Sequence, residues 1–187
     1  MPACEALVAG GINAMEVTLT TPDALNVLRQ MQKRFGDVAT TGIGSVLNAE
    51  MCRAAIEAGA EFIVTPITKK EIVDVAHAAN RPVMMGAYTP TEAQLAHEAG
   101  ADFIKMFPAN DLGPNYIRAI RAPLPHLKIV PTGGVDANTA RDFLKAGCAA
   151  LGVGTSLVSQ KILREGDWKT LTQKAAELVK IAREFRA

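Results

Sequence analysis

The chain has 187 residues, 49% of them hydrophobic, which suffices for one sizeable core and is short for two, so we expect a single domain spanning residues 1–187. Twenty basic and nineteen acidic side chains leave a formal charge of +1, which excludes the basic stripe that a nucleic-acid partner requires. The odd number of cysteines (Cys4, Cys52 and Cys148), an amino terminus unlike a signal peptide and the lack of a long apolar run predict a cytoplasmic protein with no membrane partner.

Strand-like and helical segments alternate along the chain. Short apolar runs bounded by turn residues predict strands, in chain order AMEVTLT (14–20), VATTGIG (38–44), FIVTP (62–66), VMMGA (83–87), FIKMFP (103–108), KIVPTG (128–133) and ALGVG (150–154). Apolar residues at helical spacing predict helices at 2–10, 21–35, 49–60, 69–80, 91–101, 137–147 and 167–187. In the last helix we expect the apolar face to comprise Leu171, Ala175, Leu178, Ala182 and Phe185.

A phrase repeats at four helix-to-strand junctions: ALVAGGINAMEV, AIEAGAEFIV, AHEAGADFIK and LKAGCAALGV. Each runs through an Ala-Gly pair, and glycine suits the left-handed backbone position that closes a helix. Strands that alternate with helices of this length predict parallel β/α units. Seven such strands fit an α/β fold of the TIM (β/α)8 barrel type, lacking its first amino-terminal strand, better than an open doubly wound sheet.

The missing strand is the first one, at the amino-terminal end, because the chain begins in a helical segment with no strand before it. A trimmed start, a reading frame that begins further upstream and a barrel that tolerates a gap all fit this observation. A gap would leave two exposed strand edges, which native proteins usually avoid. A lost first strand is therefore the favoured interpretation.

One lysine lies inside an apolar strand. In FIKMFP, alternation places Phe103, Lys105 and Phe107 on one face and Ile104 and Met106 on the other. If the face of the lysine points into a barrel, its amine lies near the carboxyl end of the strand, where barrel enzymes build active sites. Burial lowers the pKa of an amine and leaves a neutral nucleophile that can form a Schiff base. The alternative is a lysine whose amine reaches solvent at the rim and does no chemistry.

A carboxylate occupies an equivalent place on the first predicted strand. In AMEVTLT, Glu16 shares a face with Thr18 and Thr20. Making or breaking a C–C bond next to an iminium requires a group that moves protons, so Glu16 is the candidate general acid/base. The alternative is a buried ion pair between Glu16 and Lys105 with a purely structural role.

Glycine turns follow the last two predicted strands. Thr132, Gly133 and Gly134 come after one strand, and Gly154 and Thr155 come after the next. In barrels, loops at these places often bind phosphate, because glycine lets backbone N–H groups approach an anion at a helix start. Tight turns require glycine anyway, so the phosphate interpretation competes with an ordinary structural one.

The remaining polar residues are less specific. In GIGSVLN (42–48), Ser45 is expected to touch substrate or cap the following helix, and capping is the expected role of Asn48. His77, His97 and His126 stand at no metal-binding spacing, so we predict no metal and no cofactor.

Taken in order, the segments EVTLTTP, GIGSVLN, VTP, FIKMFPAN, VPTGG and GVGTSLV resemble the motifs of one family over nearly the whole chain. It is the 2-keto-3-deoxy-6-phosphogluconate (KDPG) aldolase family, which includes 4-hydroxy-2-oxoglutarate (KHG) and 2-keto-3-deoxy-6-phosphogalactonate (KDPGal) aldolases. The resemblance implies a class I, metal-free carbon-carbon lyase on a (β/α)8 barrel, usually a homotrimer. Its implied substrate is a phosphorylated 2-keto acid, split into pyruvate and glyceraldehyde 3-phosphate.

The same resemblance implies a role for each site residue. Lys105 in FIKMFP would form the Schiff base, and Glu16 in EVTL would be the general acid/base. Thr132 and Ser45 would line the pyruvyl end, where family members commonly have threonine in place of Ser45. The other implied residues shape the pocket (Pro66 and Phe107) or bind the phosphate (Gly133, Gly134, Gly154 and Thr155, the last often serine in the family).

Thr20 departs from part of the family. Gluconate-type members resemble EVTLRT, whereas this chain reads EVTLTT; galactonate-type members also lack the arginine and often continue with Ser-Pro or Thr-Pro, similar to Thr21-Pro22. A guanidinium binds an anion in a bidentate manner and a hydroxyl does not, so Thr20 bears on substrate choice. The C4 stereochemistry, the use of unphosphorylated 4-hydroxy-2-oxoglutarate and the subunit count stay open.

Two rival hypotheses remain at this point. The first is a phosphate-binding barrel isomerase or synthase that uses Lys105 and Glu16 only as acid and base. The second is a non-catalytic phosphosugar-binding protein, or an inert product of a truncated gene in which the missing strand abolishes turnover.

Overall fold

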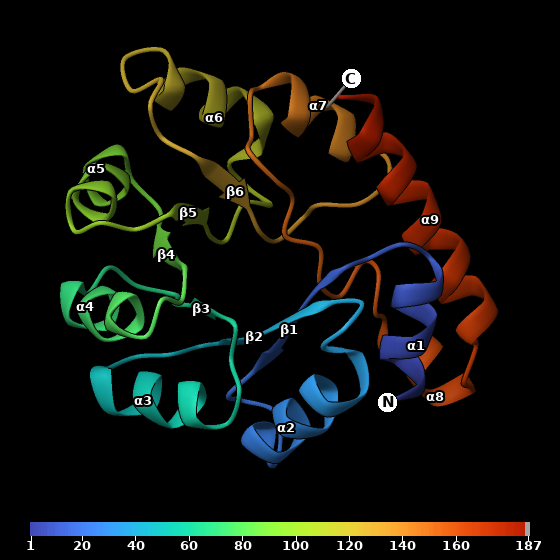
Figure 1. Ribbon diagram of the computed structural model, residues 1–187. Coiled ribbons are helices and arrows are strands. Elements are labelled where there is room, and N and C mark those ends of the chain that lie inside the picture. Colours follow the sequence, from blue (N-terminus) through green and yellow to red (C-terminus); the bar gives the residue numbers. More distant parts are fainter. Residues whose placement is uncertain (186–187) are drawn as a thin grey trace. The chain divides into compact units, whose positions relative to one another are not determined.

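The described residues, 1–185, contain six strands that form one sheet in their order along the chain (Figure 1). In this computed structural model the strands are β1 (Ala14–Thr18), β2 (Thr40–Gly44), β3 (Phe62–Val64), β4 (Val83–Ala87), β5 (Phe103–Met106) and β6 (Ile129–Pro131). The helices are α1 (Pro2–Ala9), α2 (Ala24–Phe35), α3 (Ala49–Glu57), α4 (Lys70–Ala78), α5 (Pro90–Glu98), α6 (Gly113–Arg121), α7 (Ala140–Lys145), α8 (Gln160–Glu165) and α9 (Trp168–Glu184). The pairs β1–β2, β2–β3 and β3–β4 are parallel, which confirms the predicted parallel β/α architecture.

The chain divides into two compact units. Unit 1 is Met1–Asn13 with Met106–Ala187, and unit 2 is Ala14–Lys105. Unit 2 holds β1 to β4, most of β5 and helices α2 to α5, which lie along one side of these strands in Figure 1. Unit 1 holds β6 and the remaining helices, with α1 lying against α9.

The prediction of a seventh strand at 150–154 is wrong. Within the described residues this segment makes only an isolated parallel bridge, between Thr132 and Gly152. A turn then begins at once, because the N–H groups of Leu157 and Val158 both donate to the carbonyl of Gly154. Residues 1–185 therefore show a parallel α/β fold with six strands and not a full eight-stranded barrel.

Two helices were not predicted. The first, α6, begins with Gly113-Pro114, a pair that usually reads as a turn, yet proline fits the first turn of a helix and Ile117 and Ile120 bury its inner face. The second, α8, has six residues, too few for a clear periodic pattern. Among residues 1–185 no helix has both the length and the apolar character needed to cross a bilayer.

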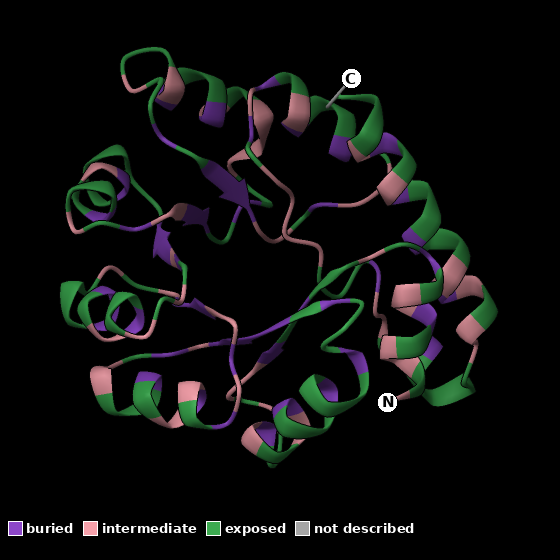
Figure 2. Cartoon of the chain, viewed as in Figure 1, coloured by how far each residue is buried: buried purple, intermediate pink, exposed green. Residues whose placement is uncertain are grey.

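A row of apolar side chains crosses the sheet of unit 2. The register pairs Val17 with Ile43, Ile43 with Ile63 and Ile63 with Val83, and all four residues are buried. Figure 2 shows buried stretches along the chain in purple. Complete burial of one such side chain contributes about 1.5–3 kcal/mol. The opposite face of the same strands carries Glu16, so the alternation predicted from the sequence separates the core from the candidate site.

The inner face of α9 forms the core of unit 1. Its buried residues are Leu171, Ala175, Leu178 and Ile181, which pack with Ala6 of α1. The prediction for this face is correct at the first three positions. It is wrong at its end, where Phe185 is exposed, Ala182 is half-buried and Ile181 provides the fourth buried side chain. Two residues of this predicted helix, 186–187, lie outside the described part of the chain.

The glycine of the repeated Ala-Gly pair adopts the predicted left-handed conformation after three helices; in the first phrase Gly10 stays right-handed and the next residue, Gly11, takes that conformation. Gly11, Gly59, Gly100 and Gly147 follow α1, α3, α5 and α7, with φ between +89° and +99°. A side chain at such a φ clashes with the backbone, so glycine is the residue that ends these helices at lowest cost.

An acidic residue after two of these glycines aligns neighbouring strands. The N–H of Glu61 donates to the carbonyl of Thr41, and its carboxylate accepts the N–H of the same threonine at 2.8 Å. Asp102 makes the same two bonds with Val83, at 3.0 and 2.8 Å. Each acid thus forms a closed ring of two hydrogen bonds with one residue of the preceding strand. Ala149 stands at the equivalent place in the fourth phrase and keeps only the backbone bond, to Ile129.

The ring at Asp102 makes stability depend on pH. Burial raises the pKa of this carboxyl, but the hydrogen bonds from His77 and the Val83 N–H outweigh it, so the pKa lies below its ordinary value. Because the unfolded chain then binds the proton more tightly, the stabilisation is complete above about pH 4 and is lost as the pH falls through the folded-state pKa.

We expect Asp102→Asn to lower the free energy of unfolding at pH 7 by about 1 kcal/mol, because a charge-assisted bond is replaced by a neutral one. Urea unfolding followed by circular dichroism at pH 7 and at lower pH measures the difference, which should shrink below about pH 4. Asp37→Asn, at an exposed carboxylate in the turn before β2, is the matched control. A difference that stays constant with pH contradicts the role of the Asp102 charge.

Candidate active site

Lys105 is a buried lysine on β5. It is 9% exposed, between Ile104 at 1% and Met106 at 0%. The N–H of Asp102, the residue just before β5, donates to the Val83 carbonyl and ties the start of β5 to β4.

Glu16 lies on the same face of unit 2, on β1. The residue is exposed, but its carboxyl group lies close against β2: a Cβ placed on Gly44 would be 1.7 Å from Glu16 Oε1. Burial of the carboxyl raises the pKa of Glu16, and the ammonium of Lys105 opposes this rise. A carboxyl group with a raised pKa that senses a neighbouring amine is suited to exchange protons near neutral pH.

Thr20 is part of a cluster of three threonines. Strand β1 ends at Thr18, two residues before the predicted end, because the N–H of Thr21 turns back to the carbonyl of Thr18. The hydroxyl of Thr18 lies 2.8 Å from that of Thr20 and 3.5 Å from that of Thr21. Two uncharged hydroxyl groups, those of Thr18 and Thr20, therefore follow Glu16 two and four residues later in the chain.

Ser45 adopts an unusual backbone conformation. Its φ is +64°, in the left-handed region that non-glycine residues rarely adopt. The chain is held on both sides of it, because the Gly44 carbonyl accepts the N–H of Leu19 and the Val46 N–H donates to Val64. Backbone strain of this kind clusters at functional sites.

Asn48 has the capping role expected of it. Its Oδ1 accepts the N–H of Met51 at 2.8 Å and so caps α3. The capping thus falls to Asn48, three residues after Ser45.

Two threonines that were not predicted as site residues, Thr65 and Thr68, fix the backbone around Pro66. The hydroxyl of Thr65 donates to the Ile67 carbonyl and accepts the N–H of Gly86, and the hydroxyl of Thr68 donates to the Gly86 carbonyl. A Cβ on Gly86 would lie 2.2 Å from the carbonyl carbon of Pro66. The two threonines that flank Pro66 in VTPITK could have indicated this arrangement. Serine and threonine are so common near turns, however, that the pattern does not stand out in the sequence.

In unit 1 the structure brings the two glycine turns together. The hydroxyl of Ser156 donates to the carbonyl of Val135 at 2.5 Å, which joins the turn of Gly154 and Thr155 to the turn of Gly133 and Gly134. Ser156 was not predicted as a site residue, because a bond to a main-chain carbonyl twenty-one residues away leaves no pattern in the sequence.

Thr132, Phe107 and Asn110 lie around the same segment of unit 1. The backbone of Thr132 donates to Met106 and accepts from Ala109, which ties the end of β6 to the chain after β5. Phe107 lies beyond the end of β5, is 41% exposed and precedes Pro108 with a cis peptide bond. Asn110, which was not predicted, contacts the Gly-Gly turn: its Oδ1 lies 2.6 Å from the place of a Cβ on Gly133.

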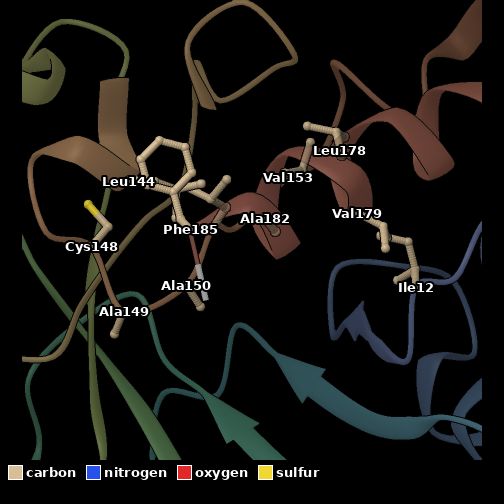
Figure 3. Close-up of a pocket in the computed structure, with 11 residues that line it drawn as sticks. Ile12, Leu144, Cys148, Ala149, Ala150, Val153, Leu178, Val179, Ala182 and Phe185 are labelled. Atoms are coloured by element: carbon tan, nitrogen blue, oxygen red, sulfur yellow. The ribbon is translucent and has the colours of Figure 1, made fainter. Parts of the chain in front are cut away.

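An apolar pocket of about 310 Å³ lies in unit 1 (Figure 3). It is lined by α7, α9 and the segment 148–153, with Leu144, Cys148 and Val179 among its residues. None of the predicted site residues lines it, so it is not the candidate active site. The part of the chain that the structure describes holds no cluster of three or more His, Cys, Asp or Glu side chains suited to a metal ion.

A model of the family described as KDPG and KHG aldolase matches residues 1–174. The chain belongs to this family. It is 32% identical over 187 residues to a 2-dehydro-3-deoxy-phosphogluconate aldolase of Pseudomonas aeruginosa, covering 100% of this chain and 84% of the relative. It is 35% identical over 182 residues to a 2-dehydro-3-deoxy-6-phosphogalactonate aldolase of Escherichia coli K12, covering 96% and 86%.

A solved member of the family shows covalent chemistry. The KDPG aldolase of Legionella pneumophila, with pyruvate captured at low pH as a covalent carbinolamine intermediate, superposes with a TM-score of 0.87 at 28% identity, covering 95% of this chain and 86% of the other. This likeness agrees with the six-stranded parallel fold.

Proposed function

We propose that the protein is a class I aldolase that cleaves a 2-keto-3-deoxy-6-phosphosugar acid into pyruvate and glyceraldehyde 3-phosphate. The observation that carries the proposal is the pair on one sheet face of unit 2: buried Lys105, and Glu16, whose carboxyl pKa is raised by burial and held down by that amine. Membership of an aldolase family supports the choice of reaction.

In the proposed mechanism, the amine of Lys105 attacks C2 of the keto acid and the carbinolamine loses water to give an iminium ion. Glu16, directly or through a water molecule, takes the proton of the C4 hydroxyl. The C3–C4 bond breaks, its electron pair flows toward the iminium nitrogen to form an enamine, and the aldehyde leaves. Glu16 returns the proton to C3, and hydrolysis releases pyruvate and restores the free amine.

The remaining residues are proposed to hold the substrate. Ser45 and Thr132 bind the pyruvyl end, Pro66 and Phe107 shape the pocket, and Thr20 lies near the part of the substrate that differs between gluconate and galactonate types. The phosphate-binding residues are Gly133, Gly134, Gly154 and Thr155. The hydrogen bond between Ser156 and Val135, which joins their two turns, supports this assignment.

Three further proposals concern the whole protein. The chain acts as one domain of the (β/α)8 type, as expected for its family. The protein works in the cytoplasm, which the free thiols of Cys4, Cys52 and Cys148 support. It forms a homotrimer, as the resemblance to its family implies, and the large apolar side chains that unit 2 leaves exposed, namely Leu47, Met51, Ile67 and Tyr88, support self-association.

For the homotrimer, we expect light scattering of the purified protein to give the mass of three chains. Replacement of Tyr88 with lysine should shift the mass toward that of one chain if this exposed surface takes part. A single-chain mass for the unaltered protein contradicts the proposal.

For the covalent step, we expect incubation with pyruvate and borohydride to add one reduced pyruvyl group to Lys105, located by peptide mass spectrometry. Lys105→Arg keeps the charge and should abolish both the adduct and pyruvate release, with a loss of at least about 10³-fold in kcat. Turnover of the substrate without any adduct favours an isomerase or synthase that uses acid/base chemistry. Thermal stabilisation by phosphorylated keto acids without turnover favours a non-catalytic binding protein.

For the phosphate subsite, we expect Gly154→Ala to raise the KM for the phosphorylated substrate about tenfold, because a methyl group blocks the close approach of a phosphate to the backbone. A Cβ here meets no atom within 4 Å, so the fold should be unaffected. Pyruvate carries no phosphate, and the rate of its trapping on Lys105 should stay unchanged. An unchanged KM removes Gly154 from the subsite.

A further inference from the structure

A glycine of β2 faces Glu16. The parallel register pairs Glu16 with Gly42 and Thr18 with Gly44, so both glycines lie on the face of the sheet that carries the carboxylate. A Cβ on Gly44 would stand 1.7 Å from Oε1, 2.6 Å from Cδ and 3.2 Å from Cγ of Glu16. The carboxyl group of Glu16 therefore occupies the space that any other residue at position 44 would fill.

Backbone conformation does not explain the glycine. The φ of Gly44 lies outside the left-handed region that the turn glycines adopt, so an alanine is compatible with the backbone there. The remaining reason for a glycine at position 44 is steric. Any larger residue would clash with the side chain of Glu16.

The space beside this recess is occupied. The adjacent space, over Gly42, is filled by the ring of Phe62, whose atoms lie 2.4 Å from the place of a Cβ on that glycine. The backbone at Gly44 is fixed by the bond from Leu19, so β2 does not move aside easily. A free glutamate side chain samples several rotamers, and in the structure the carboxyl group of Glu16 lies in this recess.

We propose that Gly44 is a positioning residue for the reaction: the recess it leaves on β2 holds the carboxyl group of Glu16 at the place from which it exchanges protons with the substrate. The proposal rests on the role of Glu16 given above. Gly44 itself touches no reacting atom and acts through Glu16, so its effect belongs to the proton-transfer steps and not to the formation of the Schiff base.

A double-mutant cycle tests the coupling. We expect Gly44→Ala to lower kcat at least about tenfold, since small displacements of a general base are costly. The KM should change less than about twofold, and the rate of pyruvate trapping on Lys105 should be retained. In the Glu16→Gln background, where no carboxylate remains to be positioned, the same Gly44→Ala change should alter kcat less than about twofold.

The control is Ile43→Val, on the opposite face of the same strand. Ile43 is completely buried, so the change costs about 0.5–1.5 kcal/mol of stability without touching the recess. It should leave kcat unchanged, which separates a loss of β2 stability from a displaced carboxylate.

If Gly44→Ala does not fold, Gly44→Ala with Glu16→Ala decides the steric part, because removal of the glutamate removes the clash. Recovery of folding in the double variant supports the recess, and failure of both variants overturns it. Equal effects of Gly44→Ala in the unaltered protein and in the Glu16→Gln variant, or no effect in either, also overturn the positioning role. Full kcat in Glu16→Gln alone instead defeats the proposed function of Glu16.

Discussion

The site depends on the opposition between desolvation and charge at Glu16. Withdrawal of the carboxyl group from water favours its neutral form, and the ammonium of Lys105 favours the charged form. Desolvation is the larger of the two influences, so the pKa of Glu16 is raised above its ordinary value, and a raised carboxyl pKa suits a residue that must take up and release a proton in one catalytic cycle. A pair that served stability alone would gain little from this arrangement, since desolvation consumes much of the attraction.

The sheet supplies the conditions for that opposition. One face of unit 2 packs a continuous row of apolar side chains against the helices, and the other carries the ionisable pair beside glycines and threonine hydroxyl groups. Successive side chains of a strand point to opposite faces, so one register determines both faces. A shift of one residue in the pairing of β1 would bury Glu16 in the core and expose Val17. The reciprocal bonds of Glu61 and Asp102, which fix neighbouring strands in register, are therefore as much a part of the chemistry as of the fold.

Features that depend on short stretches of sequence were predictable. The helix-closing glycines and the cap at Asn48 each follow from a few neighbouring residues, and the structure confirms them. Burial does not reveal the predicted alternation around Lys105, because Ile104, Lys105 and Met106 are all buried. Features that depend on contacts between distant residues were not. The contact of Glu16 with Gly44 requires the strand register, and the bond of Ser156 to Val135 joins two separate turns. The segment at 150–154 has the composition of a strand, but its glycines and the turn after Gly154 reduce it to one bridge.

The rings made by Glu61 and Asp102 have a consequence for how such a chain can vary. Each ring is closed between consecutive strands, β2 to β3 and β4 to β5, and uses no residue of the helix that connects them, so these two steps of the sheet carry their own alignment. Connecting loops can then lengthen, shorten or exchange sequence over evolutionary time without shifting the strands that follow. At the junction where Ala149 stands in place of an acid, the ring is absent, and the segment that follows makes only one bridge, between Thr132 and Gly152.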